Sequence, residues 1–337
     1  MSTNAEWLAQ HTEEALEPEL KICDPHHHLW LNRSERTAPD YMLGEMLADM
    51  NRGHNVVSTV FIECGAFYKA DGPEAMRPVG ETEFVNGIAA MSASGEFGPG
   101  RVAAGIVGHV RLTLGDEVPE VLEAHLRAGG GRFRGIRHCA AADPSPDVPK
   151  HRIFPPVDLY LDPDFRKGFA NLEHYGMTFE AWCYHPQIPS LIDLARAFPG
   201  TTIILNHFGG PIGVGPYAGK ADEIFATWKK DVTELAQLPN VVAKLGGINM
   251  DVNGFDWHLN PRPPSSEELM QATRRYYETT IELFGAERCM FESNFPVDIL
   301  STGYTVLWNS FKRLTAGYSA SEKALLYHDT AARVYRL

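Results

Sequence analysis

The stretch VVSTVFIE, residues 56–63, is an almost unbroken run of apolar and β-branched residues. Such a run is typical of a strand that is buried on both faces, as in a parallel sheet covered by helices on each side. A second run, TTIILN at residues 201–206, has the same character. Runs of this kind alternate with amphipathic helical stretches along the chain, which predicts a structure built from strand–helix units.

Eight strand-like runs can be counted outward from this stretch. They are residues 20–23, 56–63, 101–107, 133–138, 178–184, 201–206, 241–245 and 289–293. The helices expected around them are residues 41–52, 119–128, 165–175, 188–198, 222–237, 265–284, 304–314 and 319–335. Eight strands interleaved with helices is the count of a closed (β/α)8 barrel. A doubly wound sheet of eight strands is the alternative, and the alternation does not separate the two.

The 337 residues contain no internal repeat and no low-complexity linker, so we expect a single domain over residues 1–337. Residues 1–19 precede the first strand and are predicted to form an N-terminal arm, and residues 299–337 to form C-terminal helices. Two long loops, residues 140–163 and 249–264, each follow a strand. In a barrel, loops after strands surround the active site.

The composition excludes several classes of partner. The formal net charge is −13 and no Lys/Arg-rich run occurs, which argues against nucleic-acid binding, since that needs clustered positive charge. No stretch has the length of a signal-peptide core or of a membrane span. Five scattered cysteines without close spacing argue against a disulfide framework. We therefore expect a cytoplasmic protein with a small-molecule substrate; a homo-oligomer is compatible with the sequence.

Histidines stand at the ends of three strand-like runs. The first run leads into DPHHH at residues 24–28. In an extended segment alternate residues share a face, so His26 and His28 are predicted to point the same way. Two imidazoles on one face can chelate one divalent metal or hold one substrate. His185 and His207 occupy matching places after the fifth and sixth runs, and we expect both to join this site.

The eighth run, MFESNFPVD at residues 290–298, adds further polar side chains. Period-two alternation places Glu292 and Asn294 on one face. If that face is the barrel interior, Glu292 lies deeper than Asn294 and needs a polar partner. Asp298 follows four residues later and is a candidate for proton transfer.

Two basic residues lie in neighbouring runs. Arg137 stands near the end of the fourth run, and its planar guanidinium is suited to a carboxylate. We predict that it binds substrate. Lys244 lies within the seventh run; it either faces inward as a positive charge or pairs with Glu292, and both interpretations stay open.

The chain resembles the amidohydrolase-2 branch of the amidohydrolase superfamily in several places: DPHHHLW at 24–30, His185, NHFGGP at 206–211, VVAKLGG at 241–247 and MFESNFPVD at 290–298. The resemblance extends over all eight runs. It implies a TIM barrel and a metal-dependent hydrolase; the branch includes sugar-lactone and pyrone-dicarboxylate lactonases as well as nonoxidative decarboxylases. By this resemblance, the metal ligands are His26, His28 and His185, and zinc suits a site rich in histidine.

Asn294 stands where the family pattern has an aspartate, since a stretch like GSDWP reads ESNFP here. The family aspartate is a metal ligand and the base that deprotonates water, and an amide cannot act as that base. Three interpretations follow. Histidines alone hold a metal that activates water; or the site works without metal, with a histidine or Asp298 as base; or hydrolysis is lost.

The leading hypothesis is a lactonase-like hydrolase in which activated water attacks a lactone, or a related ester or C–O bond, of a small carboxylated substrate. Its expected catalytic residues are His26, His28, His185, His207, Asn294 and Asp298. Its expected substrate-binding residues are Arg137, Tyr184, Trp182, His258 and Phe295. The alternative is a nonoxidative metal-dependent decarboxylase of the same branch. A barrel that only binds a small acid is a third hypothesis, against which four titratable histidines argue.

Overall fold

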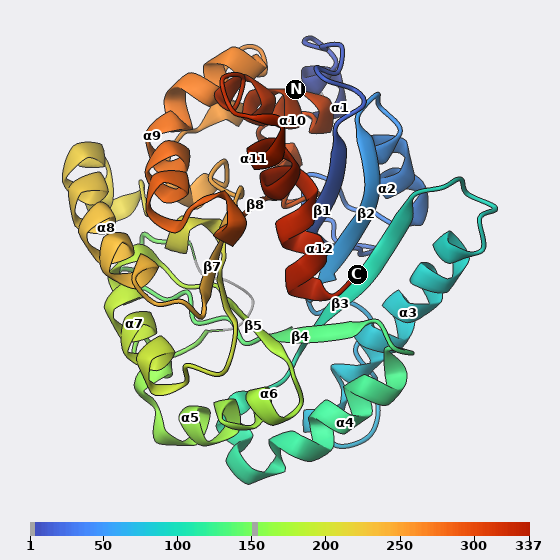
Figure 1. The fold of residues 1–337 in the computed structure, drawn as a ribbon, viewed down its shortest axis with the longest axis vertical. Helices are drawn as coiled ribbons and strands as arrows, with labels where there is room; N and C mark the ends of the chain where they lie inside the picture. The colour runs from blue at the N-terminus through green and yellow to red at the C-terminus, as the bar shows by residue number, and fades with distance from the viewer. Residues whose placement is uncertain (1–3, 150–153) are drawn as a thin grey trace.

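The computed structural model describes residues 4–149 and 154–337. Its eight strands are all parallel and neighbour one another in chain order (Figure 1). The strands are β1 Lys21–His27, β2 Asn55–Ile62, β3 Arg101–His109, β4 Phe133–Arg137, β5 Thr178–Ala181, β6 Ile203–Leu205, β7 Val241–Leu245 and β8 Cys289–Phe291. Each of the eight predicted runs contains or overlaps one of these strands.

The first and last strands meet just beyond β8. His27 forms a parallel bridge with Phe295, and the His28 N–H donates to the Phe295 carbonyl at 2.8 Å. The sheet is therefore a nearly closed barrel, as a (β/α)8 fold requires. A doubly wound sheet would reverse its strand order at a switch point, and the sequential order found here excludes that alternative.

Helices surround the barrel (Figure 1). Within the described ranges the α-helices are α1 Asn4–Leu8, α2 Leu43–Met50, α3 Val79–Ala93, α4 Val118–Ala128, α5 Pro163–Phe169, α6 Asn171–His174, α7 Ile188–Ala197, α8 Ala221–Ala236, α9 Ser266–Phe284, α10 Tyr304–Leu314, α11 Ala320–Ala324 and α12 Thr330–Tyr335. None of the helices placed in this part of the chain is long and apolar enough to cross a membrane.

Three stretches depart from the helix prediction. The single helix predicted at residues 165–175 is divided into α5 and α6. Helix α3 was not predicted, because its small and apolar residues are spread around the helix instead of forming one stripe. The single helix predicted at residues 319–335 is divided into α11, a π-helical segment Leu325–Asp329 and α12. Residues 1–3 of the predicted arm and 150–153 of the predicted loop 140–163 lie outside the described residues.

The inside of the barrel is filled by a separate cluster of apolar side chains from six strands, β1, β2, β3, β6, β7 and β8: Cys23, Val60, Ile62, Val107, Ile204, Val242 and Met290. Helix α12 contributes Ala331, Val334 and Tyr335 to the same cluster, and Figure 1 shows it lying over the ring of strands. This helix therefore closes one end of the barrel and leaves the other end for the long loops.

Strand β1 is longer than predicted. It continues through Pro25 to His27, whereas the apolar run ends at Cys23. Its pairing with β2 shifts register twice, once between Ile22 and Cys23 and again between Asp24 and His27. The irregular pairing accommodates the proline, which has no N–H to donate. As a result His26 lies in the wall of the barrel.

Candidate active site

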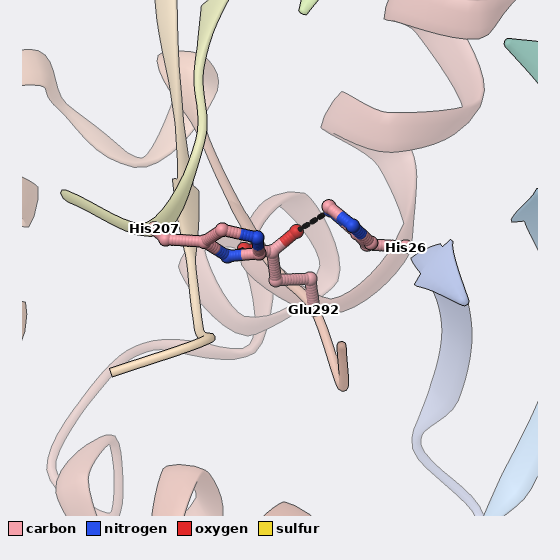
Figure 2. Close-up of side chains that lie close together, drawn as sticks. All are labelled: His26, His207 and Glu292. Atoms are coloured by element: carbon pink, nitrogen blue, oxygen red, sulfur yellow. Dashed lines mark hydrogen bonds and ion pairs between the residues drawn. The ribbon is translucent and has the colours of Figure 1, made fainter. Parts of the chain in front are cut away.

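A buried carboxylate joins two histidines that are far apart in the sequence (Figure 2). Glu292 follows β8, His26 lies on β1, and His207 follows β6. The Glu292 carboxylate oxygens lie 2.6 Å from His26 Nδ1 and 2.7 Å from His207 Nδ1. All three side chains are almost completely buried. Among the described residues, these three are the one group whose potential metal-ligating atoms all lie within 4.8 Å of one another.

The backbone near this cluster makes room for the imidazole of His207. Gly247 follows β7 with φ +66°, and a Cβ at this position would stand 1.9 Å from His207 Nδ1. His207 itself has φ +51° and Asn294 has φ +57°, a region that non-glycine residues rarely adopt. Two candidate functional residues, His207 and Asn294, are therefore among the non-glycine residues with a strained backbone.

His28 lies beside the cluster, with its ring centroid 4.9 Å from that of His26. Its Nδ1 lies 2.8 Å from the Ile62 carbonyl oxygen, which assigns the proton to Nδ1 and leaves Nε2 as an acceptor. Burial, followed by the charge of Arg137, holds the pKa of His28 well below its ordinary value. His28 is therefore neutral at physiological pH.

His26 is also kept neutral. Burial is the main cause that lowers its pKa well below the ordinary value, and the ammonium of Lys244 is the next. Lys244 Nζ lies 3.3 Å from His26 Nδ1, 2.9 Å from a Glu180 oxygen and 3.8 Å from a Glu292 oxygen. Lys244 thus faces inward and also neighbours Glu292, so the two interpretations left open by the sequence hold together.

Asn294 and Asp298 form a pair near the same site. The Asn294 side-chain amide donates to an Asp298 oxygen at 2.8 Å. Burial raises the pKa of Asp298 to about 8, because no cation neutralises its carboxylate there. The remaining amide hydrogen of Asn294 stays available to a ligand.

A pocket of about 220 Å³ opens above the cluster, a size suited to a small molecule. Its lining comprises His28, Trp30, Arg33, Arg36, Glu63, Cys64, Arg137, Cys139, Pro149, Trp182, His207, Met250, Asp251, Asn294 and Val297. Arg137 is already engaged with Glu63. Its Nε lies 2.8 Å from the Glu63 carboxylate, and its NH2 group donates to the Glu63 carbonyl.

The other predicted site residues are placed around this pocket with different contacts. Trp182 lines it and packs edge-on against His207, with 4.8 Å between ring centroids. Tyr184 packs on Trp182 and its hydroxyl donates to the Pro149 carbonyl. Phe295 packs against Tyr304. Phe295 meets the histidine-bearing strand through its backbone, since its carbonyl accepts from the His28 N–H.

His185 and His258 also lie away from the three-residue cluster. The ring of His185 faces Tyr217, with 5.3 Å between centroids, and its Nδ1 accepts from the Ile212 N–H. His258 lies in the short helix Trp257–Leu259 of the loop that follows β7, and it is absent from the pocket lining. The structure therefore brings together His26, His28, His207, Asn294 and Asp298, but not His185.

Arg33 and Arg36 are among the pocket residues that sequence reasoning missed. They lie on the loop between β1 and α2, only a few residues beyond the DPHHHLW motif. Their position could have identified them, because they lie on a loop that follows a strand, and such loops bind the ligand in a barrel. Glu292 was expected to need a partner, but its position between two histidines was not predicted.

The sequence and the fold are similar to those of known proteins. A family model described as amidohydrolase matches residues 23–337. Uncharacterized protein y4mH of Sinorhizobium fredii is 32% identical over 337 residues, which cover 95% of this chain and 99% of that protein. The L-fucono-1,5-lactonase of Burkholderia multivorans is 29% identical over 220 residues, which cover 65% of this chain and 68% of the lactonase.

A solved amidohydrolase from Burkholderia multivorans has the same fold. Its structure with bound HEPES gives a TM-score of 0.72 at 24% identity, and its structure with bound zinc gives 0.71 at 22%. Both matches cover 94% of this chain and 99% of the solved chain.

Proposed function

The chain belongs to the amidohydrolase family and is a hydrolase, and from that premise we propose that it opens the ring of a small lactone by attack of an activated water. The observation that carries the proposal is the Glu292 carboxylate held between His26 and His207. Two lactonases among the relatives support the choice of bond, since both are named for ring opening of a sugar lactone.

Glu292 fixes the protonation of the His207 ring. An ionised carboxylate only accepts hydrogen bonds, so His207 Nδ1 donates to Glu292 at 2.7 Å and the lone pair of His207 is on Nε2. For His207, which lines the pocket, this leaves Nε2 as the base toward a bound water. The carboxylate also stabilises the imidazolium that forms when His207 takes the proton, as the buried acid does in a catalytic triad.

The residues present fit a divalent metal. His26, His207 and Glu292 supply two imidazole nitrogens and a carboxylate oxygen from one buried cluster, a ligand set typical of zinc. His26 Nε2 is buried and has no hydrogen-bond partner, so a ligating nitrogen is free. These residues would hold the metal, which would polarise the carbonyl and lower the pKa of its water. His207 would then be a metal ligand, and the metal would replace it in activating water. A zinc-bound relative of the same fold supports the choice of zinc.

When His207 is not a metal ligand, side chains of the protein carry out the hydrolysis. Water donates a proton to His207 Nε2 as its oxygen adds to the lactone carbonyl. The free amide hydrogen of Asn294 donates to the developing oxyanion, since Asp298 holds that amide in place. The ring C–O bond then breaks, and the His207 imidazolium returns its proton to the leaving alkoxide. One lactone and one water give one hydroxy acid.

The pocket wall positions the ring of the substrate. Trp182 provides a flat apolar face beside His207, and His28 Nε2 accepts a hydrogen bond from a substrate hydroxyl. Arg137 is oriented by Glu63 and turns its remaining donors toward the pocket. Tyr184 packs edge-on against Trp182 and so holds its ring in position.

Proton release tests the proposal. The purified protein is mixed with a panel of sugar lactones and carboxylated lactones in weak buffer containing a pH indicator, and headspace CO₂ is measured in parallel with aromatic acids. We expect acid release from at least one lactone and no CO₂. Release of CO₂ from an aromatic acid, with silence across the lactones, would replace the proposal by the decarboxylase alternative.

A further inference from the structure

Arg33 and Arg36 give the mouth of the pocket a positive charge. Both line the pocket that contains His28 and His207, and both line the adjoining hollow above the loop that follows β2. The chain as a whole carries a formal charge of −13, so a local excess of cations at the pocket departs from the rest of the surface. Neither guanidinium forms an ion pair within the part of the chain that the structure describes.

Arg33 is held in place by groups other than a carboxylate. Its NH2 group donates to the Cys64 carbonyl at 2.8 Å, and its guanidinium carbon lies 4.9 Å from the centre of the Trp30 ring. Trp30 is buried, and its Nε1 donates to the Ala38 carbonyl at 2.8 Å. The side chain is therefore fixed before any ligand arrives, which lowers the entropic cost of binding.

Arg36 approaches the same ring, with its guanidinium carbon 5.8 Å from the Trp30 centroid. Two like charges that share one aromatic ring repel each other, and an anion placed between them relieves this repulsion. Trp30 also stacks on His28, with 6.0 Å between centroids and planes 21° apart. The two cations thus lie one aromatic ring away from a histidine of the reacting centre.

The charges around the pocket select the kind of anion. The positive charge of Arg137 is neutralised by Glu63, so this residue adds little attraction for a second carboxylate. Asp251 contributes one negative charge to the lining. Glu35 lines only the adjoining hollow, so in the pocket itself Arg33, Arg36 and Asp251 leave a single positive charge. One positive charge matches a carboxylate better than a phosphate carrying nearly two negative charges.

We infer that Arg33 and Arg36 form a subsite for a free carboxylate, and that the substrate is a lactone carrying such a group beyond its ring. This inference rests on the proposed function and narrows its substrate class. The same subsite holds the carboxylate of the ring-opened product.

The test compares γ-carboxy-γ-butyrolactone with uncharged γ-butyrolactone by kcat/KM, in the wild type and in the double variant Arg33→Met/Arg36→Met. We expect the wild type to prefer the carboxylated ring, and the double variant to lose about tenfold or more of that preference. Arg127→Met is the matched control, because Arg127 is 70% exposed on helix α4; it should keep the preference. An equal preference in the double variant and the wild type would overturn the inference while leaving lactone hydrolysis intact.

Binding of the product separates this inference from the proposed function. Calorimetry measures the Kd of hydroxyglutarate, the product of the carboxylated ring, for both proteins. If no lactone of the panel is hydrolysed, the proposed function fails; a Kd at least about tenfold weaker in the double variant would still support the subsite. A Kd unchanged by the double substitution would refute it.

Discussion

The residue that most distinguishes this site is Glu292. Alternation along the eighth run places it on the same face as Asn294, and burial implies that it needs a partner. Its partners could not be read from the sequence, because His26 and His207 are 266 and 85 positions away and meet it only when the barrel closes. The family resemblance drew attention to Asn294 instead, where the expected acid is missing. The structure places a carboxylate two residues earlier, in contact with His26 and His207.

Replacing Asn294 by aspartate tests whether an acid at position 294, in addition to Glu292, strengthens metal binding. Asn294→Asp places a second carboxylate opposite Asp298, where the Asn294 amide now donates at 2.8 Å, and a divalent cation relieves the resulting repulsion. We expect more zinc bound per chain by elemental analysis after equilibration with the metal. Asn171→Asp, on helix α6, is the control with an equal change of charge. An equal metal content in both variants would count against a metal site here.

Gly247 is predicted to be required for the position of His207. In Gly247→Ala the new Cβ overlaps the imidazole, since the nearest ring atom is 1.9 Å away, so we expect a loss of lactone turnover of about a hundredfold or more. Gly176→Ala is the matched control, because Gly176 also has positive φ but no atom within 4 Å of a Cβ. Both variants should lose about 1–2 kcal/mol of stability from the strained backbone; equal turnover in both would contradict the prediction.

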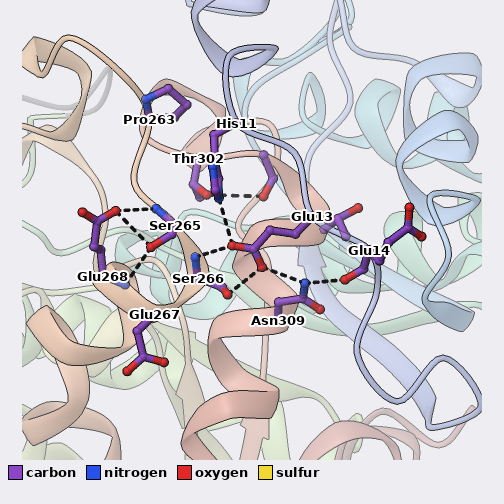
Figure 3. A network of polar contacts seen from close by, with 12 residues as sticks. His11, Glu13, Glu14, Pro263, Ser265, Ser266, Glu267, Glu268, Thr302 and Asn309 are labelled. Carbon is purple, nitrogen blue, oxygen red and sulfur yellow. Dashed lines mark hydrogen bonds and ion pairs between the residues drawn. The ribbon is translucent and has the colours of Figure 1, made fainter.

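Among the elements, the N-terminal arm is attached to two helices through one carboxylate (Figure 3). Glu13 accepts hydrogen bonds from the backbone and the hydroxyl of Ser266, the first residue of α9, and from the side chain of Asn309 on α10. His11 lies 3.0 Å from the same carboxylate. A negative group at the start of a helix is favoured by the helix dipole. The arm therefore adds to the stability of the fold.

Removing the charge of Glu13 should weaken this attachment. In Glu13→Gln an amide nitrogen replaces one accepting oxygen and faces donors, so we expect a loss of about 1–2 kcal/mol in the free energy of unfolding by urea titration. Glu14→Gln, at an exposed neighbouring position, is the control and should change the stability by less than about 0.5 kcal/mol. Equal stability of the two variants would show that the network has no net effect.

The same contact predicts a pH dependence of stability. Burial raises the pKa of Glu13, but the hydrogen bonds from Ser266, Asn309 and His11 outweigh it and lower the pKa to about 2, below the ordinary 4.5. A group with a lowered folded pKa stabilises the protein above its unfolded pKa and loses this contribution as the pH falls through the folded value. The stability difference between wild type and Glu13→Gln should therefore shrink between pH 4.5 and about 2. A constant difference across this range would refute the assignment.

The strands differ in how well their bounds could be predicted from the sequence. The runs at residues 56–63 and 201–206 were readily predicted, because strands buried on both faces have continuous apolar sequences. Strand β1 was predicted too short, since its polar residues, including His26, are buried by the site and not by the core. The pattern of apolar residues predicts which segments are buried in the core. It does not predict segments whose buried residues are polar and belong to the site.

At the scale of the whole molecule, the barrel is closed at one end by its own C-terminus. Tyr335 of α12 is fully buried, its hydroxyl donates to Glu180, and its ring lies 5.5 Å from Lys244 Nζ. Glu180 in turn holds Lys244, which neighbours His26 and Glu292. The closing helix and the reacting centre are therefore joined by one polar network inside the barrel. The sequence predicted a C-terminal helix but not that it enters the core.

Two substitutions separate packing from hydrogen bonding at this closure. Tyr335→Ala leaves a cavity and should cost about 3–5 kcal/mol of stability. Tyr335→Phe keeps the ring and removes one donor to a buried carboxylate, for a cost of about 1–3 kcal/mol. Thermal and urea unfolding give both values. Similar losses in the two variants would mean that the ring contributes little packing energy.

The fold could be predicted from the alternation of strands and helices together with the family motifs, whereas the site could be predicted only in part. Residues at strand ends, such as His28 and His207, were found because a parallel barrel gathers strand ends at one face. Side chains from loops and from within strands, such as Arg33 and Glu292, depend on packing between distant segments, which a single sequence does not reveal.

The proposed lactone hydrolysis depends most on the Glu292 carboxylate, and removal of this carboxylate is the most direct test. Turnover of the best lactone is measured for wild type, Glu292→Gln and Glu282→Gln, the last an exposed glutamate on α9, with folding checked by circular dichroism. We expect a fall in kcat on the order of a hundredfold or more for folded Glu292→Gln and none for Glu282→Gln. A folded Glu292→Gln protein with wild-type kcat would contradict the account.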